Sequence, residues 1–465
     1  MEPTPPPTTA PSSAHDHAAL GSALSAGQSY AIHGLASAAA TPFIVALLPN
    51  LTTSALLLCE HEGDALRLAT HLRRTFPQRR VLRYPTHQHY AYETKQLDPQ
   101  AVTDRLAVHA ALAEHPDCIV VATSRAALQP TISQATWRTC RQTIHPGDQL
   151  DPVTFAERCR SYGYRSAQSL AQPGDVRRVG GVVDIYPDQG SPVRVEFFDT
   201  TIESIRTYNP IEHRCIAPLA ALTISLRVEA DLQRLPALIE QLRSGVLGEL
   251  ETTTHAEWAG FLDPLSHGVP FVGDTIIQPL LLDTPPATLL DTLPPQTIVC
   301  ITNPDGCITQ AANQARYEPA TRLRLMQHRR LPQWYPTVSA PADRLLRTPQ
   351  LLLLSDAPPE HLRLLDTRCP LQTLVYTNPA SRADADATRD LPYEPGQYVT
   401  HLDHGIAVFE GIVLQNLAGK NRPYLKLRFA GTDKLYVPES QFDRVTPYGT
   451  STPPPTLTVL GTRDW

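Results

Sequence analysis

The sequence lacks the features that mark several classes of protein. No apolar run reaches the ~18–20 residues needed to span a bilayer, and the Pro/Thr/Ser-rich residues 1–13 have neither the basic nor the apolar segment of a signal peptide. The eight cysteines are scattered without a C-x-x-C pair, so neither a zinc knuckle nor a disulfide scaffold is indicated. We therefore expect reduced, mostly buried cysteines in a cytoplasmic protein that has no membrane partner.

An excess of basic residues is also absent. Forty Lys and Arg stand against 46 Asp and Glu, which gives a net charge of −6. A dedicated nucleic-acid-binding protein usually shows a basic field, so any such binding here must be local. The length of 465 residues is long for one domain and predicts two to four.

The motifs of catalysis are missing as well. The loop that cradles phosphates in a nucleotide-binding sheet is G-x-x-x-x-G-K-[ST], whereas residues 34–42 are GLASAAATP, with one glycine and no lysine. After the apolar run Thr297–Ile301, Asp305 stands alone where a magnesium-holding acidic pair is needed. Neither G-x-S-x-G nor H-E-x-x-H occurs. The sequence predicts no catalytic residue, no cofactor and no enzymatic activity.

From about residue 30 to residue 130, short apolar runs alternate with helical patterns. Ala55–Cys59, Val81–Tyr84 and Cys118–Ala122 are typical of buried strands, and a helical pattern lies near Val102–Leu112. Such alternation predicts a parallel α/β sheet.

Residues 140–225 change character. Strand-like runs at Val182–Tyr186 and Val193–Phe198 are separated by Gly, Pro and Asp turns, which favours an antiparallel or α+β insertion. Further on, Leu351–Leu354 predicts a strand, His361–Leu365 predicts a helix, and the polar Ser381–Asp390 predicts a hinge.

The best-patterned stretch is Tyr393–Tyr448. Apolar and polar residues alternate in Tyr424–Phe429 and in Lys434–Val437, and residues 430–433 between them have the composition of a turn. Short strands with Gly, Asn and Asp turns predict a small antiparallel barrel. His401 and His404 form H-x-x-H, but no Cys or third His is close, so a turn role is favoured over a metal site.

Two stretches resemble known families. GDVRRVGGVVDIYP and SPVRVEFFDTTIESIRTYNP are similar to the UvrA-binding domain of the excision-repair protein UvrB and of the transcription-repair coupling factors (Mfd), while RLAVHAAL, YPTHQHYAYE and ATLLDTLPPQTIVCITNPD resemble the surrounding α/β module. The resemblance implies UvrA as a partner, bound through Arg178, Arg194 and Phe198. Val179 stands where the family has a further arginine. The alternatives are a solvated face charge for Arg194 and an edge-packed hydrophobe for Phe198.

The C-terminal stretch carries the second resemblance. PGQYVTHLDHGIAVFEG, YLKLRFAGTDKLYVPESQFDRV and LGTRDW resemble the RNA-polymerase-interacting domain shared by CarD-type regulators and the transcription-repair coupling factors. It implies docking on the RNA polymerase β subunit through an exposed strand edge. The candidate residues are Arg422, Tyr424, Leu425, Lys426, Leu427 and Arg428. The alternatives are an inert structural module and nucleic-acid binding, through four cations with two tyrosines among them: Arg422, Lys426, Arg428 and Lys434, with Tyr424 and Tyr436.

Together these observations predict a multidomain α/β and β protein, a degenerate UvrB-like α/β module with an inserted α+β domain and then a small CarD/Tudor-like antiparallel β-barrel. The expected parts are a disordered tail (1–13), the first part of the UvrB-like domain (14–138), the inserted UvrA-binding-like domain (139–225), the return part (226–315), a shortened middle region and linker (316–390), the polymerase-interacting barrel (391–450) and a C-terminal linker (451–465).

The expected function is a non-catalytic docking scaffold in transcription-coupled DNA repair. It would bind the polymerase β subunit and UvrA, and meet DNA through the polymerase complex. The family's ATP-driven translocase follows the L-G-x-x-x-W motif, which here ends at Trp465, so we expect docking without a motor. The alternative is a CarD-like transcription regulator with a vestigial UvrB-like region.

Overall fold

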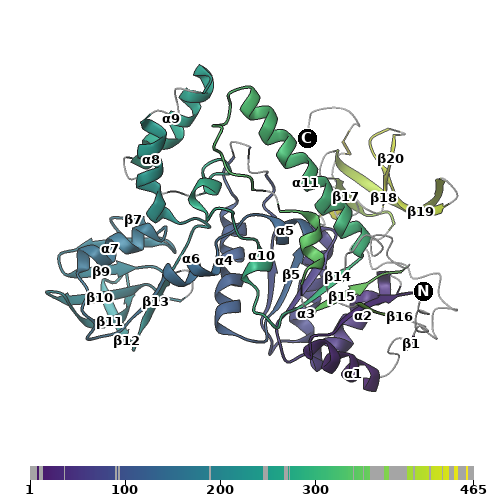
Figure 1. Cartoon of the computed structure of the whole chain (residues 1–465), viewed down its shortest axis with the longest axis horizontal. Coiled ribbons are helices and arrows are strands. Elements are labelled where there is room, and N and C mark those ends of the chain that lie inside the picture. Colours follow the sequence, from purple (N-terminus) through teal and green to yellow (C-terminus); the bar gives the residue numbers. More distant parts are fainter. Residues whose placement is uncertain are drawn as a thin grey trace, which may run out of the picture. The chain divides into compact units, whose positions relative to one another are not determined.

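The computed structural model describes residues 8–9, 14–35, 37–89, 92, 95–187, 190–244, 250–266, 271, 273–338, 340–348, 350–356, 371–375, 395–401, 404–417, 420–431, 433–438, 445–448 and 457–458 (Figure 1). It contains two compact units, Met1–Asn378 and Pro379–Trp465. The helix predicted at His361–Leu365 and the hinge predicted at Ser381–Asp390 lie outside the described residues.

The first unit is built on a parallel sheet. Among the described residues its order is β1-β16-β2-β15-β14-β3-β5-β4, and every pairing in it is parallel. The strands are β1 (Thr8–Thr9), β2 (Ser29–His33), β3 (Ala55–Cys59), β4 (Val81–Tyr84), β5 (Ile119–Thr123), β14 (Ile298–Thr302), β15 (Leu351–Leu354) and β16 (Leu371–Val375). The predicted parallel sheet is confirmed, and β15 and β16 extend it into the stretch expected to be a middle region and linker.

Helices cover both faces of this sheet (Figure 1), which is why β3 and β5 are apolar and buried along their whole length. One face packs on α1 (Ala14–Ser25), α2 (Ser37–Leu47) and α3 (Glu62–Thr75). The other packs on α4 (Pro99–Glu114), α5 (Ser124–Leu128) and the start of α11 (Pro304–Gln327). The predicted helix near Val102–Leu112 is α4, which the Asp98 side chain caps by accepting from the Gln100 amide.

A second, smaller core joins the far half of α11 to the helices between the inserted domain and β14. Trp258 and Tyr335 are fully buried in it, and the Tyr335 hydroxyl donates to the Ile276 carbonyl at 2.8 Å. The other helical elements of this core are η2 (Leu232–Arg234), α8 (Leu235–Arg243), α9 (Thr252–Ser266) and η4 (Gln278–Leu281). Three short elements pack instead in the cores on the two faces of the parallel sheet: η1 (Leu48–Asn50), α10 (Leu289–Thr292) and η5 (Ala342–Leu346).

The inserted domain has the α+β character that the sequence predicts. Its main sheet has the order β12-β11-β10-β9-β8-β7, antiparallel except for the pair β7 and β8. Its elements are β6 (Arg141–Ile144), β7 (Arg165–Ser166), β8 (Asp175–Val179), β9 (Val182–Ile185), β10 (Val193–Phe198), β11 (Thr201–Asn209), β12 (Arg214–Pro218), β13 (Leu222–Ser225), α6 (Gln134–Thr139) and α7 (Pro152–Ser161). Val183, Val195 and Phe197 share the inner face and pack on Phe155 of α7.

The second unit is an antiparallel sheet with the order β20-β19-β18-β17-β21. The strands are β17 (Tyr398–His401), β18 (Gly405–Leu417), β19 (Lys420–Arg428), β20 (Lys434–Pro438) and β21 (Val445–Pro447). Both predicted alternating runs are strands. Among the described residues no pairing joins β20 to β21, so closure into a Tudor-like barrel stays a prediction.

The expectation that Tyr424–Phe429 forms an exposed strand edge is wrong. β19 pairs with β18 on one side and with β20 on the other, so its backbone groups are already used by the sheet. The physical reason is the alternation itself, because Leu425, Leu427 and Phe429 supply the apolar face of a central strand and are fully buried.

Candidate partner-binding surfaces

The first unit contains a buried ionic cluster around Glu229. Its carboxylate accepts from Arg105 Nε at 3.0 Å and bonds His87 Nε2 at 2.7 Å, and both Arg105 and Glu229 side chains are fully buried. Burial alone raises the pKa of Glu229, but Arg105 and His87 outweigh it and hold that pKa far below its usual range. Arg105 also lies over the ring of Tyr84 at 4.1 Å. These contacts tie α4 and the end of β4 to residues that follow the inserted domain.

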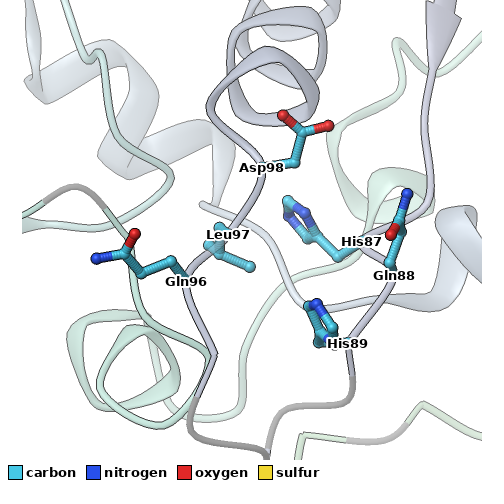
Figure 2. A pocket seen from close by; sticks show the side chains of 6 residues that line it. All are labelled: His87, Gln88, His89, Gln96, Leu97 and Asp98. Atoms are coloured by element: carbon cyan, nitrogen blue, oxygen red, sulfur yellow. The ribbon is translucent and has the colours of Figure 1, made fainter.

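Figure 2 shows the pocket that opens beside this cluster. It is lined by His87, Gln88, His89, Gln96, Leu97 and Asp98 and holds about 120 Å³. Sites for small-molecule ligands and cofactors usually measure roughly 300–1,000 Å³. The pocket is therefore too small to support a nucleotide site.

The loop where a phosphate would bind is occupied by the protein itself. The Gly34 amide donates to the Asp356 carbonyl and the Leu35 amide donates to the Ser355 carbonyl, each at 3.0 Å. A phosphate loop needs such amides to be free. Directly after β14, the Asn303 side chain caps α11 by accepting from the Gly306 amide, and it donates to Glu60 at 2.5 Å. Asp305 lies in the first turn of the same helix.

The outer face of the inserted domain is organised around Asp184. Its side chain is 3% exposed and forms two bonds with Arg194, at 2.7 and 3.0 Å, while Arg177 approaches it at 3.5 Å. Arg194 also stacks on the Tyr208 ring, with 3.9 Å from the guanidinium carbon to the ring centroid. The Asp184 carboxylate raises the pKa of Arg194. Arg194 is thus held in place by structural contacts and is not a mobile solvated charge.

Phe198, at the end of β10, is 76% exposed. The regular alternation of β10 buries Val193, Val195 and Phe197 and leaves Phe198 on the outward face, while the register shift beside it adds an extra residue to β11 rather than to β10. Val179 of β8 is also exposed, at 56%, and Arg178 donates to the Gly180 carbonyl at 3.1 Å. The edge-packed alternative for Phe198 does not fit this exposure.

In the second unit, a β-bulge places the carboxylate of Glu410 beside Lys426 and Arg428. The register shifts between Phe409 and Gly411, where Gly411 takes a φ of +127°, so Glu410 is the extra residue of β18. Its carboxylate lies 3.1 Å from Lys426 Nζ and 2.9 Å from Arg428 Nε. The bond to Lys426 lowers the pKa of Glu410 and raises the pKa of Lys426.

The remaining predicted polymerase-binding residues differ in exposure, because alternate residues of a strand face the core and the surface. Leu425 and Leu427 are fully buried in the unit's own core, so their side chains do not reach the surface. Tyr424 is half-buried, and the side chain of Arg422 lies outside the described residues. Tyr436 on β20 lies opposite Lys426 in register and is 40% exposed.

Neither metals nor disulfides are indicated in the part of the chain that the structure describes. His401 and His404 have ring centroids 4.7 Å apart, yet no group of three or more His, Cys, Asp or Glu there has metal-binding geometry. All seven described cysteines are free thiols, and six are buried. None of the described helices combines the length and the apolar character that a membrane span needs.

Comparison with known proteins matches two segments of the chain to family models. Residues 143–226 match the UvrB interaction domain, and residues 393–449 match the CarD-like/TRCF RID domain. The transcription-repair-coupling factor of Bacillus subtilis (strain 168) is 22% identical over 544 aligned residues, covering 93% of this chain and 46% of that protein. The chain is similar to the N-terminal part of the transcription-repair-coupling factors. Those of Staphylococcus haemolyticus (strain JCSC1435) and Staphylococcus aureus (strain Mu50 / ATCC 700699) are 22% and 20% identical and cover 94% and 93% of the chain. The chain spans about half the length of these relatives.

Sequence reasoning missed the partners that fix the predicted residues. Asp184 and Tyr208 hold Arg194, and Glu410 holds Lys426 and Arg428. Alternation would have placed Asp184 and Arg194 on outward faces, but only the strand register shows that they are opposite each other. The bulge at Glu410 has a weak signal, Gly411 inside an otherwise regular strand.

Proposed function

We propose that this chain is a docking scaffold in transcription-coupled DNA repair, with one surface for RNA polymerase and another for UvrA. The observation that carries the proposal is the presence of both matched domains in one chain, each with its own exposed residues. The occupied amides of Gly34 and Leu35 support a role without nucleotide chemistry.

For the polymerase β subunit, the proposed surface is the outer face of β19 and β20. It comprises Tyr424, Lys426 and Arg428 of β19 with Lys434 and Tyr436 of β20. Since Glu410 fixes Lys426 and Arg428, the surface is preorganised and loses little side-chain freedom on binding. Tyr436 is the proposed anchor, because tyrosine buries a large area with few rotatable bonds. The edge of β20 offers backbone groups for an added strand.

For UvrA, the proposed surface is the outer face of the inserted domain. Phe198 supplies an exposed apolar anchor on this face. Arg178, the third proposed residue, is exposed but lies opposite the inner-face residue Val183 in register, so it is on the other face of the sheet. Arg194 acts here as a fixed cation whose charge Asp184 offsets. Binding through this face would therefore rely more on Phe198 than on Arg194.

Binding of the full chain to purified polymerase β subunit and to purified UvrA, measured separately, tests the proposal. Tyr436→Ala should weaken binding to β by at least about tenfold, as expected for an interface anchor, and leave UvrA binding unchanged. Tyr448→Ala, the same change just beyond β21, is the matched control. Binding to β alone would favour the CarD-like regulator, and binding to neither would reject both functions.

A further inference from the structure

The far half of α11 carries a basic surface that the docking function does not use. The residues exposed on one side of this 24-residue helix follow helical spacing and include Arg316, Tyr317, Leu323, Arg324 and the flanking His328. None of these is acidic. The helix has two acids, Asp305 in its first turn and Glu318, which is buried. The charged side chains exposed along this side are therefore all basic.

Composition makes this segment unlike the rest of the chain. Residues 316–330 contain five arginines and one acid, whereas the whole chain has 46 acids against 40 Lys and Arg. Of the five, Arg322 points elsewhere, donating to the Tyr335 carbonyl at 2.9 Å. We define the arginine ridge as Arg316 and Arg324, on one side of α11, together with Arg330, which lies just beyond the helix end at Gln327; all three are exposed.

The charges of the arginine ridge are not offset. In the part of the chain that the structure describes, no ion pair joins Arg316, Arg324 or Arg330 to a carboxylate. Glu251 approaches the end of the helix, but through its amide, which donates to the Arg329 carbonyl at 2.9 Å. This contrasts with Arg194, Lys426 and Arg428, each of which has an acid within 3.1 Å.

The spacing suits a rigid polyanion. Arg316 and Arg324 are eight residues apart on one side of the helix, which corresponds to about 12 Å along its axis. Duplex DNA carries one negative charge for about every 1.7 Å of axis, so both side chains would meet phosphates at once. An acidic protein surface seldom offers charges at such density. Tyr317 and Leu323, which are 46% and 57% exposed, lie between the arginines and can contact sugars.

We propose that the arginine ridge binds the phosphate backbone of duplex DNA, without reading its sequence. The proposal is independent of the two docking surfaces, since it uses none of their residues. It gives an acidic chain a local nucleic-acid contact through arginines whose charge is uncompensated.

Fluorescence anisotropy of the full chain with a labelled duplex, titrated at several salt concentrations, tests it. Each phosphate contact contributes about −0.9 to the slope of log affinity against log salt, so three contribute about −2.7. Affinity should then fall about 40-fold between about 50 and 200 mM salt. Replacing Arg316, Arg324 and Arg330 together by Ala should remove most of this dependence.

The matched control replaces Arg74, Arg80 and Arg138 by Ala. These are exposed arginines of the same unit, and both triple variants move the net charge from −6 to −9. The control should bind duplex like the unchanged chain, with both variants shown to be folded by circular dichroism. The proposal is overturned if the two triple variants bind equally. It is also overturned if the unchanged chain ignores duplex DNA but binds polyglutamate through the same arginines.

Discussion

The inserted domain and the C-terminal sheet present opposite kinds of surface. On its outer face the inserted domain pairs the charge of Arg194 with Asp184 and Tyr208 and exposes a large apolar side chain, Phe198. The C-terminal sheet buries its large apolar side chains and exposes a cluster of charges around Glu410. The same alternation of residues along a strand thus yields an apolar anchor in one domain and a polar platform in the other, where a bulge adds Glu410 to β18.

The largest effect we expect is on the folding of the C-terminal sheet. Leu427→Ala removes a fully buried side chain from a small core and should cost about 2–5 kcal/mol in the free energy of unfolding. Hydrogen exchange of the β18 and β19 amides should accelerate, while amides of the inserted domain stay protected. Unchanged protection in β19 would mean that Leu427 is not a core residue.

A smaller loss of stability is expected in the inserted domain. Asp184→Asn leaves Arg194 without its carboxylate partner and should lower the free energy of unfolding by about 1–3 kcal/mol. Urea unfolding measures this loss. Glu196→Gln is the matched control. Glu196 lies on β10, on the same outward face of the sheet as Asp184, and accepts only from Ser204 among the bonds that the structure describes. Equal stability of the two variants would show that Asp184 does not organise this face.

The next effect concerns binding rather than folding. Phe198→Ala should weaken UvrA binding by at least about tenfold, because this side chain is exposed in the free chain and would be buried only in the complex. Ile211→Ala is the control, since Ile211 is exposed by 88% in the turn between β11 and β12 of the same domain. If both substitutions weaken UvrA binding alike, Phe198 has no special role and the contrast between the surfaces fails.

The smallest effect we expect is a pH dependence in the stability of the C-terminal sheet. The folded pKa of Glu410 is lowered, so its bonds to Lys426 and Arg428 stabilise the sheet above its ordinary pKa and are lost as the pH falls through the folded value. Hydrogen exchange in β18 should therefore differ between Glu410→Gln and the unchanged chain near neutral pH. The difference should vanish in acid and shrink with salt. A difference that grows on acidification would reverse the assigned sign.

Local patterns predicted the strands well and the neighbours of each strand poorly. Ala55–Cys59, Val81–Tyr84, Val193–Phe198 and Leu351–Leu354 are strands with the predicted bounds, because apolar runs and alternation are properties of the segment itself. The central position of β19 could not be read from its own residues, since it depends on β18 and β20.

Contacts between distant residues were beyond sequence reasoning. Arg105 lies in the stretch RLAVHAAL and Glu229, 124 residues further on, lies in no quoted stretch, so nothing in the sequence pairs them, yet they form a fully buried ion pair beside the pocket. The outward position of Phe198 follows from the alternation of its strand, but its exposure of 76% depends on what packs against that face, which the sequence does not show. The segment from residue 316 was visible as arginine-rich, but only the helix shows that Arg316 and Arg324 lie on one side of it.

The central claim is that one chain offers two independent docking surfaces. The most direct test is sedimentation of the full chain with both the polymerase β subunit and UvrA present. We predict a ternary complex, loss of UvrA alone with Phe198→Ala, and loss of β alone with Tyr436→Ala. Competition between the two partners for the unchanged chain, or loss of both partners with either substitution, would contradict the claim.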